Sequence, residues 1–273
     1  MNNYNAPIGV FDSGVGGLTV AKEIMTQIPN ERIVYFGDTA RVPYGSKSKK
    51  TITKYTRQII RFLMTYDVKA LVIACNTMSA NALEEVEKEL SIPIIGVVKP
   101  GARVAASQTK NRRIGVIATE STIHSEMYEH FINQIDPSLQ VIGKACPLFC
   151  PLVEEGMLDD PVTDEIVRRY LTGLMEQNVD TLILGCTHYP LLAPAIGRIV
   201  GEKVRLVNPA YETAKELRGL LELKNLLNQD PAEDSDSQYR FYVSDLADKF
   251  SNFAANILHN DNLTTAQVDI EKY

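Results

Sequence analysis

The chain has 273 residues, 45% of them hydrophobic and 23% charged, which is ordinary for a globular protein with one large domain or two of common size. A net charge of −6 at pH 7 excludes the bulk attraction to phosphate on which most nucleic-acid binders depend, so no nucleic-acid partner is expected. No apolar run approaches the ~20 residues of a membrane span and the first residues lack the features of a secretory signal, so we expect a cytoplasmic protein without a membrane partner.

Short apolar runs alternate with helical stretches almost to residue 210. Because the runs consist of consecutive β-formers, they predict parallel strands that are buried on both faces. The predicted strands cover residues 8–11, 33–36, 70–74, 92–98, 114–118, 141–142, 181–184 and 204–207. The helical stretches between them, whose charged faces we interpret as solvated, include residues 48–66, 80–90, 123–135 and 162–176. This alternation is typical of right-handed βαβ units.

The last part of the chain adds weaker elements. Residues 211–227 have the pattern of a helix, and the polar, acidic segment 229–238 that of a loop. A strand at 240–243 and an amphipathic helix at 250–258 are expected to return to the first half of the protein. After His259 the apolar period is weak, which predicts a mobile tail.

The second half of the chain repeats the first. Residues 68–77 return as 179–188, and each copy is an apolar run that ends in a cysteine and continues with polar residues. The two cysteines, Cys75 and Cys186, lie 186 − 75 = 111 residues apart. Weaker echoes begin at residues 8 and 114, 33 and 139, and 94 and 204, at offsets of 106, 106 and 110. The pattern indicates a duplicated α/β unit.

We therefore predict an α/β fold with two similar parallel-sheet lobes that are related by a pseudo-twofold axis, and an active site in the cleft between them. The segment 99–101 (KPG) is the predicted crossing between the halves. It divides a first lobe, residues 1–98 plus 211–273, from a second lobe, residues 99–210. Such a cleft would place Cys75 and Cys186 opposite each other, which suits chemistry that needs one acid or base on each face of a substrate.

Polar residues lie where ligands of open α/β sheets bind, beyond the carboxyl ends of the predicted strands. They are Asp12, Ser13, Asp38, Thr39, Cys75, Asn76, Thr77, Thr119, Cys186, Thr187 and His188. One such cysteine alone is more often a small core residue, but two at matching places of a repeat favour catalysis. A thiol with a pKa of about 8.5 is a poor base at neutral pH unless a neighbour or a helix N-terminus stabilises the thiolate. Asp12 and His188 are the candidate partners, with a turn, cap or core role as the alternative for each.

Two other motifs restrict the chemistry. The glycine-containing segment 12–18 joins the first strand to a helix, and its backbone N–H groups suit an anion, a carboxylate as well as a phosphate. Thr19 stands where the dinucleotide fingerprint needs glycine, and no G-x-x-x-x-G-K-[ST] segment occurs, so no nucleotide is predicted. Cys146 and Cys150 are spaced like metal ligands, but without a second pair or a histidine cluster we predict buried structural thiols and no metal.

Five motifs in order resemble the glutamate racemase family over nearly the whole chain: residues 10–18 (VFDSGVGGL), 36–45 (FGDTARVPYG), 74–77 (ACNT), 151–156 (PLVEEG) and 185–190 (GCTHYP). The resemblance implies an isomerase that interconverts L- and D-glutamate without a cofactor and supplies D-glutamate for peptidoglycan. It implies that Cys75 and Cys186 are the two bases: one thiolate removes the Cα proton, and the opposite thiol delivers a proton to the other face. Homodimers are common in this family.

The resemblance also implies roles for other residues. Asp12, Asp38, Glu154 and His188 match positions that support the proton chemistry. The positions that match substrate contacts are Asp12, Ser13, Tyr44, Gly45, Asn76, Thr77, Thr119, Thr122, Thr187 and His188.

The chain departs from the family pattern at Met78, Cys150 and Asn208-Pro209, and Met78 is expected to lie close enough to the cleft to alter its packing. Two other functions stay open. One is a racemase of the wider aspartate/glutamate group that acts on aspartate, a hydantoin or a related α-acid. The other is a two-lobed small-molecule binding protein without chemistry, because duplicated lobes around a cleft suit that role too.

Overall fold

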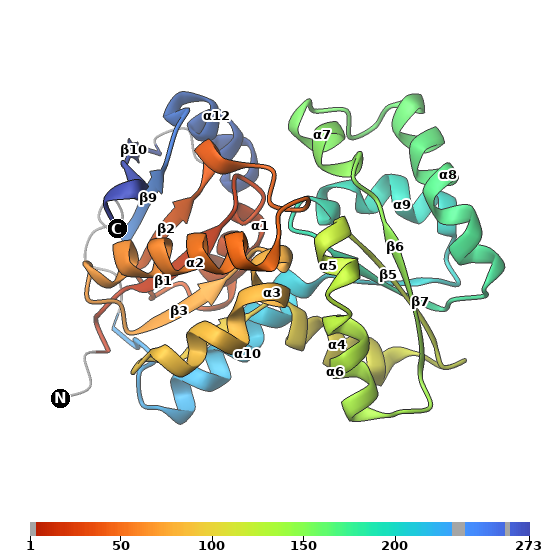
Figure 1. The fold of residues 1–273 in the computed structure, drawn as a ribbon, viewed down its shortest axis with the longest axis horizontal. Helices are drawn as coiled ribbons and strands as arrows, with labels where there is room; N and C mark the ends of the chain where they lie inside the picture. The colour runs from red at the N-terminus through yellow and green to blue at the C-terminus, as the bar shows by residue number, and fades with distance from the viewer. Residues whose placement is uncertain (1–3, 231–237, 260–262) are drawn as a thin grey trace.

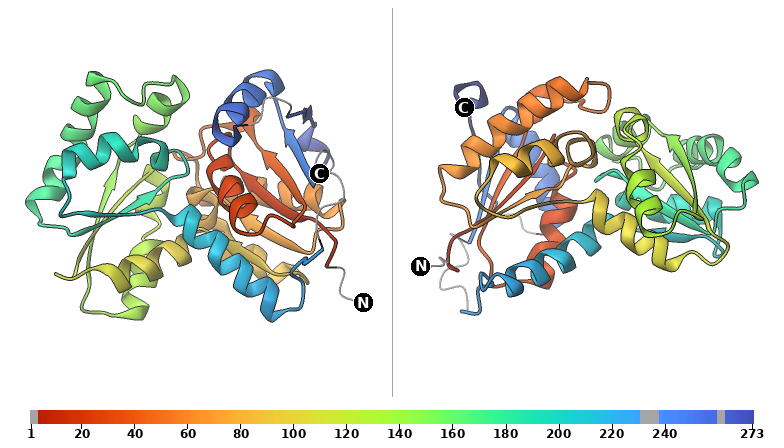
Figure 2. Two further views of the ribbon diagram at one scale, coloured as in Figure 1. Left: turned by 180° about the vertical axis from the view of Figure 1, so that it is seen from behind. Right: turned by 60° about the horizontal axis from the view of Figure 1, so that its bottom comes forward.

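The structure is a computed structural model that describes residues 4–230, 238–259 and 263–273. Two parallel β-sheets lie side by side, each between layers of helices (Figure 1), and the view from behind in Figure 2 shows the same two lobes. Among the described residues no helix has both the length and the apolar character needed to cross a bilayer.

The first sheet has the strand order β10-β9-β2-β1-β3-β4, and every neighbouring pair in it is parallel. Its strands are β1 (Ile8–Asp12), β2 (Ile33–Gly37), β3 (Ala70–Ile73), β4 (Ile94–Gly96), β9 (Tyr239–Val243) and β10 (Thr265–Gln267). The second sheet has the order β6-β5-β7-β8 and is also parallel throughout. Its strands are β5 (Arg113–Ala118), β6 (Gln140–Ala145), β7 (Thr181–Gly185) and β8 (Arg205–Val207).

The order of the strands confirms the duplication. The unit β2-β1-β3-β4 of the first sheet has the topology of β6-β5-β7-β8 in the second, so that each predicted echo joins corresponding strands. β3 and β7, the third strand of each unit, lead to Cys75 and Cys186. The predicted α/β class with two similar parallel-sheet lobes is therefore correct.

Helices cover both faces of each sheet. Those on the first sheet are α1 (Leu18–Gln27), α10 (Pro209–Leu223) and α12 (Ala247–Leu258) on one face, and α2 (Lys49–Met64) and α3 (Asn76–Val86) on the other. Those on the second are α4 (Val98–Gln108) and α6 (Met127–Ile135) on one face, and α7 (Phe149–Glu154), α8 (Pro161–Glu176) and α9 (Ala193–Val200) on the other. The short helix α5 (Glu120–His124) follows β5.

Helix α2 illustrates why these sequences fold as they do. Ser48 begins the helix, and its side chain accepts a hydrogen bond from the backbone N–H of Thr51. Ile52, Ile59 and Leu63 recur at helical spacing and are fully buried against the sheet. Burial of each such side chain contributes about 1.5–3 kcal/mol.

The chain passes from the first sheet to the second through helix α4. The segment 99–101 lies in the first turn of α4, where Pro100 removes an N–H that has no partner within the helix. The chain leaves the second sheet through α10, which packs against both α1 and α4. The domain boundaries 1–98 plus 211–273 and 99–210 stay a prediction.

The expectation of a mobile tail is wrong for the described part of it. β10 pairs in parallel with β9 at the edge of the first sheet, and Ile270 is buried in the core under α2. A three-residue strand is too short to produce a recognisable apolar period, and its order comes from backbone pairing. Most of the predicted loop at 229–238, namely residues 231–237, lies outside the described residues.

Candidate active site

Cys75 and Cys186 line the same cavity, which has a volume of about 340 Å³ and lies between the carboxyl ends of the two sheets. The first lobe contributes Ser13, Val42, Pro43, Tyr44, Gly45, Ser46, Cys75, Asn76 and Thr77. The second contributes Thr119, Glu120, Pro147, Cys150, Pro151, Glu154, Cys186, Thr187 and His188. A cavity of this size suits a small-molecule substrate.

Cys75 lies between β3 and α3 and caps the helix. Its Sγ accepts the backbone N–H of Met78 at 3.5 Å and donates to Ser13 Oγ at 3.4 Å. Burial, followed by the negative charge of Asp12, raises the pKa of this thiol to about 12. The thiol is therefore protonated at neutral pH, although the helix N-terminus favours its thiolate.

Asp12 ends β1 directly before the cavity-lining Ser13 and is itself buried behind the cavity wall. Its Oδ2 accepts the backbone N–H of Gly14 at 3.0 Å. Burial raises the pKa of this carboxyl, partly offset by the charge of His188 and by backbone N–H donors. The result is a carboxyl group beside Cys75 with an increased tendency to hold a proton.

Cys186 follows β7 and has different partners. Its Sγ lies 3.8 Å from His188 Nδ1, and His188 Nε2 lies 3.0 Å from Glu154 Oε1. Burial lowers the pKa of His188, but the hydrogen bonds with Cys186 and Glu154 outweigh it and raise the pKa to about 10. A protonated His188 stabilises a thiolate at Cys186 because opposite charges attract.

A third thiol, that of Cys150, lies next to Cys186. Cys150 Sγ lies 3.6 Å from Cys186 Sγ. The hydrogen bond shared with Cys150, followed by burial, raises the pKa of Cys186 well above its ordinary value, and His188 acts in the opposite direction. Cys146 is buried as predicted, but Cys150 is only partly buried and lines the cavity, so the prediction of a buried structural thiol is wrong for it.

Hydroxyl and amide groups join the two lobes across the cavity floor. Thr77 Oγ1 lies 2.8 Å from Thr119 Oγ1 and 3.3 Å from Thr122 Oγ1, and Tyr128 donates to Asn76 Oδ1 at 2.6 Å. Thr122 is buried behind this network. The N-terminal ends of α3 and α5, which line the cavity, are thus held together by side chains from both lobes.

The glycine loop after β1 touches the loop that carries Cys186. Thr19 Oγ1 donates to the carbonyl of Thr187 at 3.0 Å. A Cβ atom on Gly16 would lie 2.4 Å from Thr187 Oγ1 and 2.5 Å from His188 Nδ1. Glycine is required at residue 16 because the second lobe occupies the space of a side chain.

The cavity brings together most of the residues singled out in the sequence. Those that line it are Ser13, Tyr44, Gly45, Cys75, Asn76, Thr77, Thr119, Glu154, Cys186, Thr187 and His188. Asp12, Thr122 and Asp38 lie behind its wall. Asp38 accepts hydrogen bonds from Tyr44, from Arg41 Nε at 2.7 Å and from Ser244 Oγ at 2.8 Å, so it holds a cavity-lining side chain in place.

Other lining residues were not predicted: Val42, Pro43, Ser46, Glu120, Pro147, Cys150 and Pro151. Several of them lie within or beside the motifs at 36–45 and 151–156, which is the signal that could have found them. Cys150 lies one helical turn before Glu154 on α7, a spacing that places both on one face. The side chain of Met78 is fully buried in the core of the first lobe, and what reaches the site is its backbone N–H.

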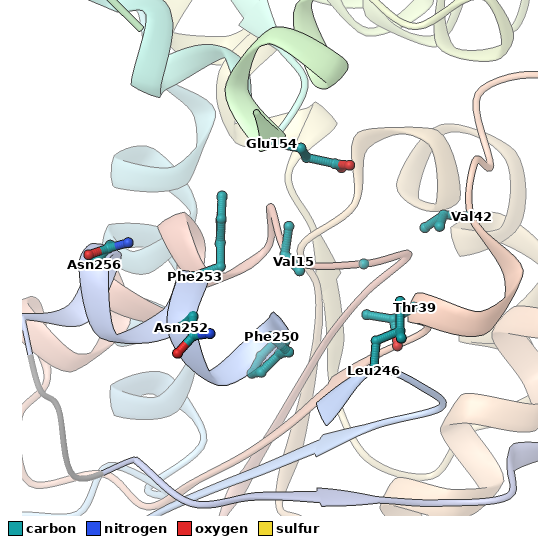
Figure 3. A pocket seen from close by; sticks show the side chains of 10 residues that line it. Val15, Thr39, Val42, Glu154, Leu246, Phe250, Asn252, Phe253 and Asn256 are labelled. Carbon is teal, nitrogen blue, oxygen red and sulfur yellow. The ribbon is translucent and has the colours of Figure 1, made fainter. Parts of the chain in front are cut away.

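A second cavity, of about 270 Å³, adjoins the first (Figure 3). Val42 and Glu154 line both cavities. In Figure 3 Glu154 and the α12 residues Phe250 and Phe253 lie on opposite sides of this space. The C-terminal helix therefore lies next to the site as well as on the first sheet.

Comparisons with known proteins agree with this arrangement. A family model described as Asp/Glu/Hydantoin racemase matches residues 8–217. A glutamate racemase of Geobacter metallireducens is 49% identical over 264 residues, which cover 97% of each chain.

Two crystal structures are similar over nearly the full length. A glutamate racemase isoform from Bacillus anthracis has a TM-score of 0.93 and 41% identity, with 98% of each chain covered. A glutamate racemase from Francisella tularensis, in complex with D-glutamate, has a TM-score of 0.90 and 39% identity, with 99% of this chain and 100% of that chain covered. On its sequence, its fold and its paired strand-end cysteines, this chain belongs to the Asp/Glu/hydantoin racemase family.

Proposed function

We propose that this protein, an amino-acid racemase, interconverts L- and D-glutamate without a cofactor, with Cys75 and Cys186 as the two bases. The observation that carries the proposal is that the two thiols follow corresponding strands of a duplicated fold and line one cavity. One group from each lobe can thus reach a single substrate carbon. A binding protein without chemistry would have no use for this pair.

The first step of the proposed reaction is formation of a thiolate. The raised pKa values of both thiols keep them protonated in the free enzyme. A bound amino acid brings an ammonium group into the cavity, and a nearby positive charge lowers a thiol pKa. The His188 imidazolium, held by Glu154, supports the thiolate of Cys186, and the Asp12 carboxyl lies beside Cys75.

The second step is transfer of the proton across the substrate. One thiolate takes the Cα proton, and the other thiol gives its proton to the opposite face. Positioned acid–base groups typically contribute about 10²–10⁴-fold, so the carbanionic transition state needs further stabilisation from fixed donors in a closed cavity. For this role and for binding the carboxylates we propose Ser13, Tyr44, Gly45, Asn76, Thr77, Thr119, Thr122 and Thr187, with Asp38 positioning Tyr44.

Glutamate is the proposed substrate because the relatives that align over almost the whole chain are glutamate racemases. D-glutamate made in this way would supply peptidoglycan synthesis. We place the reaction in the cytoplasm, where a reducing environment keeps catalytic thiols free. The homodimer implied by the family resemblance is tested by sedimentation equilibrium.

The test is incubation with L-glutamate in heavy water, after dialysis against a chelator and without an added cofactor. We expect the Cα–H signal to disappear in the NMR spectrum while the D-enantiomer forms. Faster exchange of the Cα hydrogen of aspartate than of glutamate would show that the protein is an aspartate racemase of the same family. Saturable binding of glutamate without exchange would overturn the proposal in favour of a binding protein.

A further inference from the structure

Three metal-ligating groups gather in the cavity wall: Cys150 Sγ, Cys186 Sγ and a ring nitrogen of His188 all lie within 4.8 Å of one another. The two sulfur atoms are 3.6 Å apart, and Cys186 Sγ is 3.8 Å from Nδ1. They come from two elements, α7 and the loop after β7, that face each other in the second lobe. The racemase chemistry uses Cys186 and His188 but gives Cys150 no task.

Two of the three distances between these atoms are those of a tetrahedral zinc site. Zn–S bonds of about 2.3 Å and Zn–N bonds of about 2.0–2.1 Å place tetrahedral ligands about 3.5–3.8 Å apart. The Cys150–Cys186 and Cys186–His188 distances already have this size and the third lies within 4.8 Å, so binding an ion requires only a small movement of the side chains. A disulfide, in contrast, would need the two sulfur atoms to approach to about 2.05 Å. We propose that Cys150, Cys186 and His188 bind one thiophilic divalent cation, such as Zn²⁺, and that the bound ion stops racemisation.

The surroundings of the three ligands fit such an ion. Glu154 Oε1 lies 3.0 Å from His188 Nε2, the nitrogen that would not bind the ion. A carboxylate at this place keeps the proton on Nε2 and directs the lone pair of Nδ1 to the metal. Two thiolates favour zinc over magnesium or calcium and neutralise its charge in a buried site. All three ligand residues line the cavity, so water or a carboxylate in the cavity could supply the fourth ligand.

The inhibition follows because the ion would take up the lone pairs of the sulfur atoms. Binding releases the two thiol protons, and a third proton if His188 is an imidazolium, and each sulfur gives a lone pair to the ion. Cys186 then has no free thiolate to take the Cα proton and no thiol proton to deliver. This part of the inference rests on the proposed function, whereas metal binding itself does not.

The experiment begins with metal-free protein, kept reduced under argon with a phosphine reductant. Zn²⁺ is titrated by calorimetry, and Co²⁺ serves as the spectroscopic probe. We expect one ion per chain and a sulfur-to-cobalt charge-transfer band. The Cys150→Val variant should bind zinc at least 100-fold more weakly, and Glu154→Gln about 10-fold more weakly. The matched control is Cys146→Ala, because Cys146 is buried and lies outside the cluster, and it should bind as the wild type does.

Inhibition is measured as each variant's rate with zinc divided by its own rate without metal. The wild type should lose nearly all activity at one equivalent of zinc, and Cys150→Val should keep most of its own rate. Undiminished affinity in both Cys150→Val and Cys150→Ala, or a cobalt complex without the charge-transfer band, would overturn the site. Tight binding without inhibition would overturn the inhibitory role. If the protein racemises nothing, the calorimetry and the cobalt spectrum still decide the metal site, so the two failures are distinguishable.

Discussion

The two cysteines occupy corresponding positions of one duplicated unit, yet their surroundings differ. Cys75 caps a helix and faces a hydroxyl and a buried carboxyl, those of Ser13 and Asp12. Cys186 faces an imidazole that is held by a carboxylate, and a second thiol. The duplicated fold fixes the position of each thiol, and the side chains around the thiol determine its pKa. A racemase built this way has two bases with different electrostatic support.

The largest effect is expected from removing either base. Cys75→Ala and Cys186→Ala should each lower racemisation by about 10³-fold or more, because the other thiol cannot both take and deliver the proton. Turnover is measured by the loss of optical rotation, and the fold is checked by circular dichroism. Cys146→Ala is the control and should lose some stability but little turnover. Near-normal turnover in either catalytic variant would contradict the two-base mechanism.

The next effect concerns His188, whose imidazole lies beside Cys186 and not beside Cys75. His188→Gln should lower turnover by about 10²-fold, since it removes the positive charge beside one base. The free energy of unfolding should also depend on this charge. The folded-state pKa of about 10 lies above the ordinary value of 6.5, so the stabilisation is complete below pH 6.5 and is lost as pH rises through about 10.

The melting temperature of the wild type should therefore fall more steeply between pH 6.5 and 9 than that of His188→Gln. The comparison stops at pH 9 because Cys75 also affects stability above that pH. The pKa of its thiol rises from the ordinary value of 9.0 to about 12 in the folded protein. Parallel curves for the two proteins would show that His188 is uncharged in the folded state.

A smaller effect distinguishes the two bases by the enantiomer on which each one acts. Amino acids with a good β-leaving group need one base only, so Cys75→Ser and Cys186→Ser should each keep elimination activity on one enantiomer. We expect opposite preferences of about tenfold or more in the two variants. Elimination rates are measured by release of the leaving group from each enantiomer. Equal losses for both hands would argue against separate bases.

The smallest effect concerns the contact between the lobes. Thr119→Val removes a hydroxyl that lies 2.8 Å from Thr77 Oγ1. The loss of about 1 kcal/mol should raise KM about fivefold with a smaller change in kcat. Thr213→Val is the matched control, because the Thr213 hydroxyl is buried but bonds within α10, to the carbonyl of Pro209 at 2.7 Å. A raised KM in both variants would show a general loss of stability.

Much of this arrangement could be predicted from the sequence because parallel strands buried on both faces leave long apolar runs, and ligands of such sheets bind beyond their carboxyl ends. The run that ends at Ile73 and the one that ends at Gly185 both carry this signal. The match between the two copies then indicated one cavity rather than two.

Other features could not be predicted because they depend on tertiary contacts. β10 owes its order to backbone pairing with β9, which leaves no mark on a three-residue segment. The sequence predicts a structural thiol at Cys150, because its neighbour in space, Cys186, is far away in the sequence. Asp38 shares a strand-end position with the cavity residues, yet it points to Arg41 and Ser244.

The close approach at Gly16 has a consequence for how the duplicated halves can evolve. Residue 16 belongs to one copy, but the space around it is filled by Thr187 and His188 of the other. A mutation that adds a side chain there must displace the imidazole beside Cys186, so substitutions in the loop of one copy are limited by the loop of the other.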